Sequence, residues 1–294
     1  MNPSKSHCGL IALLGPPNAG KSTLINRIVN SKVSIVSHKA QTTRTRVCGI
    51  VSEGQTQIIL FDTPGIFRPK RLADQPIIEV AWRGAKDADL LVLVVDAHLG
   101  FDENTMQIIH GLNKINRNTV LALNKVDNIK REKLLPLAAQ LNEVFKFEKI
   151  FMISALTGSG CKDLKIYLST RIPSGPWLYT ENELSNIPMR LMAAEITREK
   201  IFLHLHKELP YSIIVKTDRW TERDDGSIKI DQVLYVKRNN HKKITLGKGG
   251  KNIKHISFLA RNELEKMLEH RVHLFLFIKV RKKMSRKLSK PVLV

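Results

Sequence analysis

A glycine-rich octapeptide near the beginning of the chain limits its fold more than any other feature. Residues 15–22 run Gly-Pro-Pro-Asn-Ala-Gly-Lys-Ser and fit the pattern G-x-x-x-x-G-K-[ST]. The octapeptide follows a short apolar run at 10–14 and precedes a helix-like segment at 23–29. A phosphate-binding loop requires this order of strand, glycine loop and helix. The pattern therefore predicts an α/β fold with a phosphate site after its first strand.

Each residue type in this loop suits a phosphate ligand. Glycines let backbone N–H groups close around a phosphate, and the helix N-terminus adds its dipole. We expect Lys21 to reach the terminal phosphates and the Ser22 hydroxyl to ligate Mg²⁺. The predicted nucleotide-binding residues of the loop are Gly15, Pro16, Pro17, Asn18, Ala19, Gly20, Lys21, Ser22 and Thr23.

A second motif follows the apolar run 58–61, which predicts a buried strand. Its residues are predicted to line the nucleotide site, and they are Asp62, Thr63, Pro64, Gly65 and the adjacent Ile66. Asp62 is expected to hold Mg²⁺ through water, and the Gly65 N–H is expected to contact the γ-phosphate. Many signalling GTPases have a glutamine where this chain has Ile66, and that glutamine orients the attacking water. Because isoleucine can neither accept nor donate a hydrogen bond, hydrolysis should be slow or rely on another group.

Two further apolar runs, 120–123 and 151–153, deliver residues that suit guanine. The Asp127 carboxylate can accept hydrogen bonds from guanine N1–H and the 2-amino group. Adenine lacks this pair of donors, so an unpaired buried carboxylate would reject it by roughly 10⁴-fold. A backbone N–H at Ser154–Ala155 can donate to guanine O6. The predicted base-binding residues are Asn124, Lys125, Asp127, Ser154 and Ala155. Four motifs in this order predict a GTPase with GTP and GDP as its ligands.

Two assignments beside the phosphates stay open. The segment 41–44, Gln-Thr-Thr-Arg, is either the first switch or a solvated linker. If it is the switch, Thr42 or Thr43 completes the Mg²⁺ shell with Ser22 and Asp62, and we favour Thr43. In GTPases with P-N-x-G-K-S loops, which this loop resembles, the asparagine helps to bind K⁺, so Asn18 either holds K⁺ or only shapes the loop. The candidate catalytic residues are Lys21, Thr43, Asp62 and Gly65.

The charge of the chain points to a polyanionic partner. Its 48 lysines and arginines against 27 aspartates and glutamates give a formal net charge of +21. Such an excess favours nucleic acid or an anionic membrane surface. Cys8, Cys48 and Cys161 lie far apart without metal-ligand spacing, which predicts no disulfide partners and suits a reducing cytoplasm. No stretch approaches the roughly 18 apolar residues of a membrane span, so we expect a soluble or at most peripheral protein.

Up to about residue 170 the chain alternates short apolar runs with helix-like segments. The runs predict strands at 9–14, 58–61, 90–95, 120–123 and 150–153. This alternation is typical of a mostly parallel sheet with helices on both faces and a ligand at the carboxyl ends of the strands. Two prolines and a glycine within 172–177 then indicate a linker.

The remainder predicts a smaller α+β domain. A helical run at 188–207 precedes β-rich runs at 211–217 and 227–237. A further helix follows, and a strand at 272–280 closes the unit. Between two helical segments lies Gly-Lys-Gly-Gly at 247–250. In this α-β-β-α-α-β order, a G-x-x-G loop is typical of a type II KH domain, which grips about four nucleotides of single-stranded RNA. The predicted RNA-binding residues are Gly247, Lys248, Gly249, Gly250, Lys251 and Lys254.

We therefore expect four segments along the chain. They are a GTPase domain at 1–175, a linker and the start of the second domain at 176–200, a KH domain at 201–280 and a basic tail at 281–294.

Both domains together resemble the Era family of bacterial GTPases, which carry a C-terminal KH domain. The resemblance extends to about residue 280 and rests on segments 17–24, 40–44, 62–65, 124–127, 208–212 and 247–261. It implies a factor in small (30S) ribosomal subunit assembly and rRNA processing, which binds the single-stranded 3′ end of 16S rRNA through the KH domain. It also implies association with the inner face of the cytoplasmic membrane.

Two alternatives remain. An RNA-binding protein with a purely structural nucleotide site would not hydrolyse GTP, although the intact Lys21, Ser22 and Asp62 argue against it. A membrane-surface GTPase would use its positive charge on lipid. RNA is favoured over lipid because a membrane needs charge but no loop that admits a sugar-phosphate backbone. Sedimentation with liposomes under RNA competition would distinguish RNA binding from lipid binding.

Overall fold

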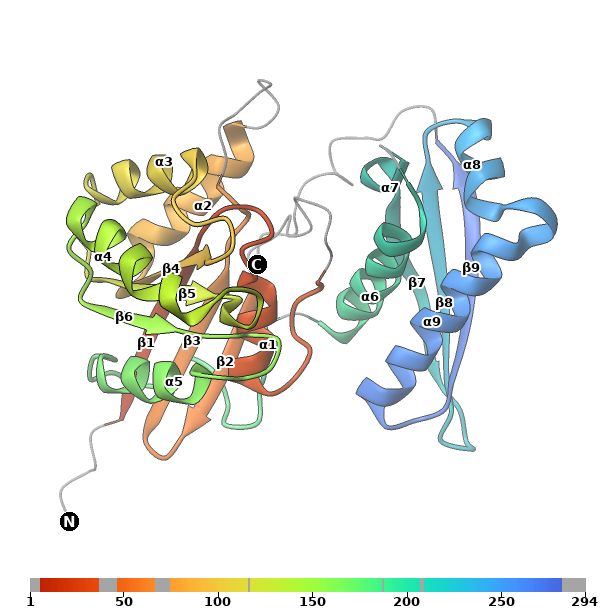
Figure 1. Ribbon diagram of the computed structural model, residues 1–294. Helices are drawn as coiled ribbons and strands as arrows, with labels where there is room; N and C mark the ends of the chain where they lie inside the picture. The colour runs from red at the N-terminus through yellow and green to blue at the C-terminus, as the bar shows by residue number, and fades with distance from the viewer. Residues whose placement is uncertain are drawn as a thin grey trace, which may run out of the picture. The chain divides into compact units, whose positions relative to one another are not determined.

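The chain forms two compact units, and the boundary between them along the chain falls after Asn186. The computed structural model describes residues 6–36, 47–66, 75–115, 117–186, 188–206 and 209–281. Each unit has its own sheet (Figure 1). Each also has its own apolar core.

A six-stranded sheet forms the centre of the first unit, in the order β2-β3-β1-β4-β5-β6. Every strand pair is parallel except β2 with β3. The strands are β1 (His7–Leu14), β2 (Val47–Glu53), β3 (Thr56–Asp62), β4 (Leu90–Asp96), β5 (Thr119–Asn124) and β6 (Lys149–Met152). The five parallel strands match the five predicted apolar runs. Their carboxyl ends lie at one edge of the sheet, and the predicted nucleotide motifs follow four of them.

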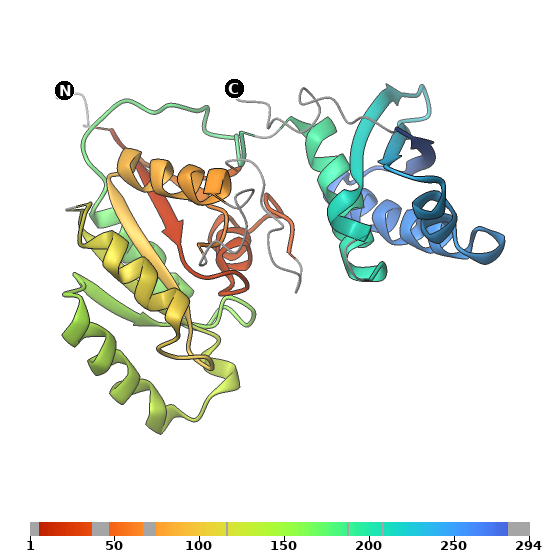
Figure 2. The ribbon, with the colours of Figure 1, turned by 90° about the horizontal axis from the view of Figure 1, so that it is seen from above.

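Helices cover both faces of this sheet (Figure 2). On one face, α1 (Lys21–Val29) and α5 (Cys161–Thr170) bury Leu24, Ile28 and Leu164 against the strands. The other face packs against α2 (Gln75–Asp87), α3 (Glu103–Leu112) and α4 (Leu134–Val144). Two short 3₁₀ turns, Val126–Asn128 and Arg131–Lys133, follow β5. The predicted α/β class is therefore confirmed.

One strand was not predicted. Strand β2 follows the candidate switch and mixes apolar with small and polar residues, so its sequence lacks a clean apolar run. Its stability comes from seven antiparallel partner positions on β3, from Val47 opposite Asp62 to Glu53 opposite Thr56. Such pairing depends on a neighbouring strand and cannot be read from the segment alone.

The first unit also extends into the segment 176–200, which was predicted to be a linker and the start of the second domain. The side-chain oxygen of Gln57 accepts hydrogen bonds from the N–H groups of Leu178 and Tyr179, each at 3.0 Å. Tyr179 packs against the small apolar cluster of Cys48, Ile59 and Phe61. The division between the units therefore falls after Asn186 and not at 175, because 176–186 lies along the first sheet.

A three-stranded sheet in the order β7-β8-β9 forms the second unit, with β7–β8 antiparallel and β8–β9 parallel. Its elements are α6 (Met189–His204), α7 (Leu209–Ser212), β7 (Ile214–Glu222), β8 (Ile228–Val236), α8 (Asn239–Leu246), a 3₁₀ turn (Lys248–Gly250), α9 (Lys251–Leu268) and β9 (Val272–Val280). The predicted α-β-β-α-α-β order is confirmed, with the short α7 in addition. The predicted start at 201 lies within α6, which packs on this sheet through Met192 and Ile196.

Among the residues that the structure describes, no helix combines the length and the apolar character that a membrane span needs.

Candidate nucleotide site and RNA-binding loop

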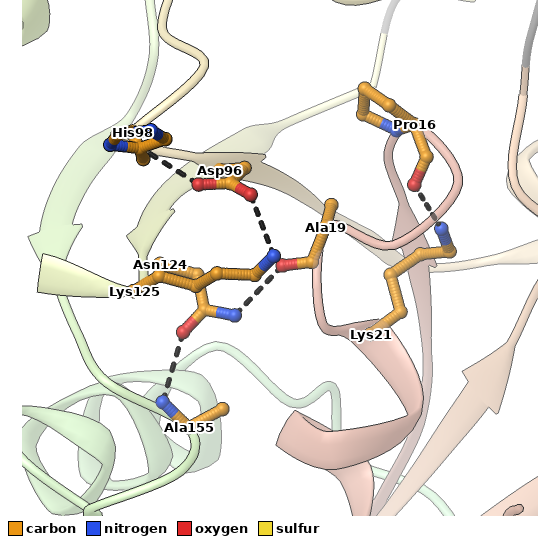
Figure 3. Close-up of polar contacts among 8 residues, drawn as sticks. All are labelled: Pro16, Ala19, Lys21, Asp96, His98, Asn124, Lys125 and Ala155. Carbon is orange, nitrogen blue, oxygen red and sulfur yellow. Dashed lines mark hydrogen bonds and ion pairs between the residues drawn. The ribbon is translucent and has the colours of Figure 1, made fainter. Parts of the chain in front are cut away.

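The predicted phosphate loop closes around the ammonium group of Lys21. Lys21 Nζ donates to the carbonyl oxygen of Gly15 at 2.9 Å. It also donates to the carbonyl oxygen of Pro16 at 2.8 Å, the contact drawn in Figure 3. Gly20 has φ 99°, and a Cβ there would lie 2.2 Å from Asn124 Nδ2, so only glycine fits. The loop thus has the strand–loop–helix setting that the sequence predicts, between β1 and α1.

Burial changes the acidity of Lys21. Its side chain is 6% exposed, and loss of water lowers the pKa of Lys21 from 10.5 to about 8, partly opposed by the nearby Asp62 carboxylate. The folded nucleotide-free chain therefore binds this proton less tightly than the unfolded chain. The free energy of unfolding should consequently rise with pH between about 8 and 10.5.

We expect nucleotide binding to take up a proton at Lys21 in mildly alkaline solution. Phosphate oxygens beside the ammonium would raise the pKa of Lys21, so proton uptake on GDP binding should increase from about pH 7 to about pH 8.5. Calorimetry in two buffers of different ionisation enthalpy measures this uptake. Equal uptake at both pH values would contradict the assignment of Lys21 to the phosphates.

Two hydroxyl groups converge on the carboxylate of Asp62 at the end of β3. Ser22 Oγ and Ser34 Oγ each donate to Asp62 Oδ2 at 2.6 Å. Hydroxyl and carboxylate oxygens are the hard ligands that Mg²⁺ prefers, so the Ser22–Asp62 pair fits the predicted metal position. Ser34 was missed because the loop after α1 carries no motif around it. Thr43 and Thr42 lie outside the described residues.

The segment after Asp62 packs tightly against the phosphate loop. A Cβ on Gly65 would lie 2.7 Å from the backbone nitrogen of Pro17, and the Ile66 N–H donates to the Gly15 carbonyl at 3.1 Å. The Thr63 hydroxyl donates to the Leu13 carbonyl of β1. The Ile66 side chain is fully buried in the apolar core, so only its backbone faces the loop.

Asn124 holds the phosphate loop and the 154–155 segment together. Its Nδ2 donates to the Ala19 carbonyl at 2.8 Å, and its Oδ1 accepts from the Ala155 N–H at 2.9 Å (Figure 3). The side chain is 2% exposed, which suits a positioning role. The Ala155 N–H is therefore bonded to Asn124 in this structure. Asp127 lies in the turn after β5 and is exposed.

Asp96 is a residue of this site that the motifs do not reveal. Its Oδ2 pairs with Lys125 Nζ at 2.6 Å, and its Oδ1 accepts from the His98 N–H at 3.0 Å. Lys125 has φ 66°, a left-handed conformation that is uncommon for residues other than glycine. Its position in the sequence could have revealed Asp96, because it ends the apolar run of β4 at the edge of a parallel sheet where ligands bind.

Arg27 is a third missed residue. Its Nε donates to the Ala155 carbonyl at 3.1 Å, and its guanidinium also bonds the Leu156 carbonyl. Ser154 Oγ accepts from the Thr157 N–H at 3.2 Å within the same loop. Helix α1 therefore begins with phosphate-loop residues. Near its end, Arg27 holds the 154–156 segment, which includes the residues predicted to bind guanine.

The predicted RNA-binding loop joins α8 to α9. Gly247, Gly249 and Gly250 all have positive φ, at 74°, 61° and 77°. A Cβ on Gly247 would lie 2.7 Å from the Asn252 side chain, whereas Gly249 has open space around it. Asn252 Nδ2 donates to the Ile244 carbonyl at 2.9 Å and fixes the entry to the loop. A backbone without Cβ at the open position lets a sugar-phosphate chain approach closely.

Solvent-exposed lysine side chains lie in and around this loop. Lys248, Lys251 and Lys254 are exposed, and Lys243 of α8 is exposed beside them. Of the apolar residues that follow, Ile256 is fully buried in the core and Ile253 is half-buried against it. Phe258 is 51% exposed.

Fold, loops and comparisons agree on the class of protein. A family described as a 50S ribosome-binding GTPase matches residues 10–125, and a KH domain family matches 208–285. The chain is a P-loop GTPase with a KH domain. A GTPase Era from Sinorhizobium medicae is 57% identical, with 93% of this chain and 88% of that protein covered. A GTPase Era from Brucella suis is 54% identical, with 95% of this chain and 89% of that protein covered. This chain belongs to the GTPase Era family.

Solved structures lead to the same family. Era in complex with MgGDPNP and nucleotides 1506–1542 of 16S ribosomal RNA has a TM-score of 0.88 and 35% identity, with 94% of each chain covered. An Aquifex aeolicus Era variant bound to GDP and tetrafluoroaluminate gives the same score, identity and coverage.

Proposed function

We propose that this GTPase is a nucleotide-controlled switch whose KH domain binds the single-stranded 3′ end of 16S rRNA during small-subunit assembly and rRNA processing. The observation that carries the proposal is the open Gly247–Gly250 loop, with Gly249 unobstructed and Lys248 exposed. An Era structure that covers 94% of this chain was crystallised with nucleotides 1506–1542 of 16S ribosomal RNA. We place the protein in the cytoplasm. Association with the inner face of the membrane rests only on the positive charge and the family resemblance.

The nucleotide site suits GTP hydrolysis. Negative charge that develops on the transferring phosphate must be met by fixed positive groups. Lys21 would exchange the carbonyls of Gly15 and Pro16 for phosphate oxygens, and the Gly65 N–H would donate to the γ-phosphate. Ser22 would hold Mg²⁺ directly and Asp62 would hold it through water. When bound, Mg²⁺ supplies charge neutralisation between the phosphates.

On the base side, the Asp127 carboxylate would accept the N1–H and 2-amino groups of guanine. Its exposure in this structure leaves it accessible to a base, which would then remove it from water. Asn124 would act as a positioning residue, because both ends of its amide already bond the Ala19 carbonyl and the Ala155 N–H.

Hydrolysis without partners is expected to be slow and to depend on the monovalent cation. The Ile66 side chain is apolar and fully buried, so it cannot position water. If Asn18, which has φ 63° in the phosphate loop, helps to hold K⁺, then replacing K⁺ by Na⁺ at constant ionic strength should lower the rate several-fold. Asn18→Ala should remove that difference. Equal wild-type rates in both salts would leave Asn18 as a loop-shaping residue.

A binding assay tests the proposed RNA function. The full chain should bind a single-stranded RNA with the 3′-terminal sequence of 16S rRNA more tightly than the same RNA annealed to its complement. Affinity should fall by roughly 0.7 log units per phosphate contact for each tenfold rise in salt. Equal affinity for the duplex would contradict recognition of a single strand by the KH loop.

A further inference from the structure

The sheet of the second unit carries helices on one face only, within the part of the chain that the structure describes (Figure 2). Alternate residues of β8 and β9, such as Ile230, Leu234 and Leu274, are buried in the cores beneath α6 and α9. Because side chains alternate along a strand, the residues between them lie on the opposite face. On that outer face Phe275 is 45% exposed and Phe277 is 51% exposed.

These two rings lie two positions apart on the edge strand β9. Their Cα atoms are therefore about 6.5–7 Å apart along the strand, a spacing that neighbouring bases of an extended RNA strand can match. In the neighbouring strand β8, Val233 pairs with Phe277 and is only 3% exposed. The ring of Phe277 is therefore open to solvent, although its neighbour on the same face is buried.

Cations surround the rings on the same face. By strand alternation and pairing, the outer face carries Lys216, Arg219, Lys229 and Lys279, and Arg281 follows β9. Lys229 Nζ lies 5.4 Å from the centre of the Phe275 ring, and Arg281 Cζ lies 5.1 Å from that of Tyr235. The acidic group between them, Asp231, has a side chain only 13% exposed and lies 4.0 Å from Lys229. The exposed charge of this face is therefore mainly positive.

We propose that this outer face, defined by Tyr235, Phe275, Phe277 and the cations around them, is a second binding surface for single-stranded RNA. Aromatic rings on a sheet accept stacked bases, and flanking cations accept the phosphates. An apolar protein partner would have to bury these cations. Duplex RNA does not present unstacked bases. The Gly247–Gly250 loop leads into α9, which packs on the other face through Ile256, Ala260 and Leu264. The two surfaces are therefore separate, and this proposal does not depend on the loop.

The test is ultraviolet crosslinking of the full chain to a 12-nucleotide uridine-rich single-stranded RNA, with peptide mapping and fluorescence anisotropy on the same RNA. Adducts should map to Phe275 or Phe277 as well as to the loop. Joint Phe275→Leu and Phe277→Leu replacement keeps an apolar surface but removes the rings. It should remove these adducts and weaken binding by roughly 5- to 100-fold, the range expected for losing one stacked base. Phe101→Leu is the matched control, since Phe101 is an exposed phenylalanine of the first unit and should change nothing.

Two results would overturn the proposal. One is adducts confined to the loop, with unchanged affinity in a Leu pair variant that melts at the wild-type temperature, which leaves the proposed KH function intact. The other is concentration-dependent self-association that the Leu pair abolishes without any change in RNA affinity, which would assign the face to a second copy of the chain. Joint Lys248→Asp and Gly249→Asp replacement reports on the loop separately. Adducts on β9 that persist in that variant at saturating RNA support two independent surfaces.

Discussion

Asp127→Asn should convert the guanine preference of this GTPase into a xanthine preference. The change replaces a carboxylate acceptor by an amide that can donate, opposite the base position where xanthine has a carbonyl and guanine an amino group. Loss of two hydrogen bonds to a charged acceptor should weaken GDP binding by about 10²-fold or more. Displacement of a fluorescent GDP analogue by GDP, xanthosine diphosphate and ADP measures the change, with wild-type ADP weaker than GDP by roughly 10⁴-fold.

Asp96→Asn provides a matched control for this experiment. Asp96 lies at the same edge of the sheet, but its carboxylate bonds Lys125 and the His98 N–H, and it is assigned no contact with the base. Its replacement should weaken all three nucleotides together without changing their order. Comparable affinity of the wild type for GDP and ADP, or the same order in the Asp127 variant, would contradict the base assignment.

Joint Lys248→Asp and Gly249→Asp replacement should abolish tight binding of the 3′-terminal 16S segment. It removes one cation and places two negative charges where the sugar-phosphate chain must come close, so affinity should fall by about 10²-fold or more. The open space around Gly249 accommodates the new side chain, and the left-handed backbone is one that aspartate adopts more readily than most residues. GTP turnover should stay near the wild-type rate, because the nucleotide residues lie in the other unit.

A variant with the same charge change elsewhere in the second unit controls for net charge. Gly226 also has positive φ and open space, and Lys266 is exposed in the last turn of α9. Joint Gly226→Asp and Lys266→Asp replacement should reduce RNA affinity only slightly. If a folded loop variant, checked by circular dichroism, binds the segment as tightly as this control, the loop is not the RNA-binding site.

The nucleotide motifs were predictable because each is local. Lys21, Ser22 and Asp62 sit at fixed distances from glycines and apolar runs, and the structure brings Ser22 and Asp62 to 2.6 Å from each other. Ser34 and Asp96 act through partners far away in the sequence. A pattern search over short windows therefore finds the loop and misses the residues that hold it in place.

Tertiary pairing explains the other differences. Strand β2 depends on β3 for its hydrogen bonds, and the 176–186 arm depends on Gln57 and the cluster around Tyr179. Strand β2 lacks a clean apolar run, and the arm follows the prolines and glycine of 172–177, which indicate a linker. Similarly, the alternation of Phe275 and Phe277 predicts a strand with two faces. It does not say which face the helices cover until the sheet is known.

We expect this GTPase to bind the 3′ end of small-subunit rRNA through its KH domain in the cell. The most direct measurement is sequencing of RNA crosslinked to the chain in growing cells, with the Lys248→Asp and Gly249→Asp variant in parallel. Wild-type reads should accumulate at the 3′-terminal segment of 16S rRNA, and the variant should lose that peak. Wild-type reads spread over other RNAs, with no accumulation at that segment, would contradict the claim.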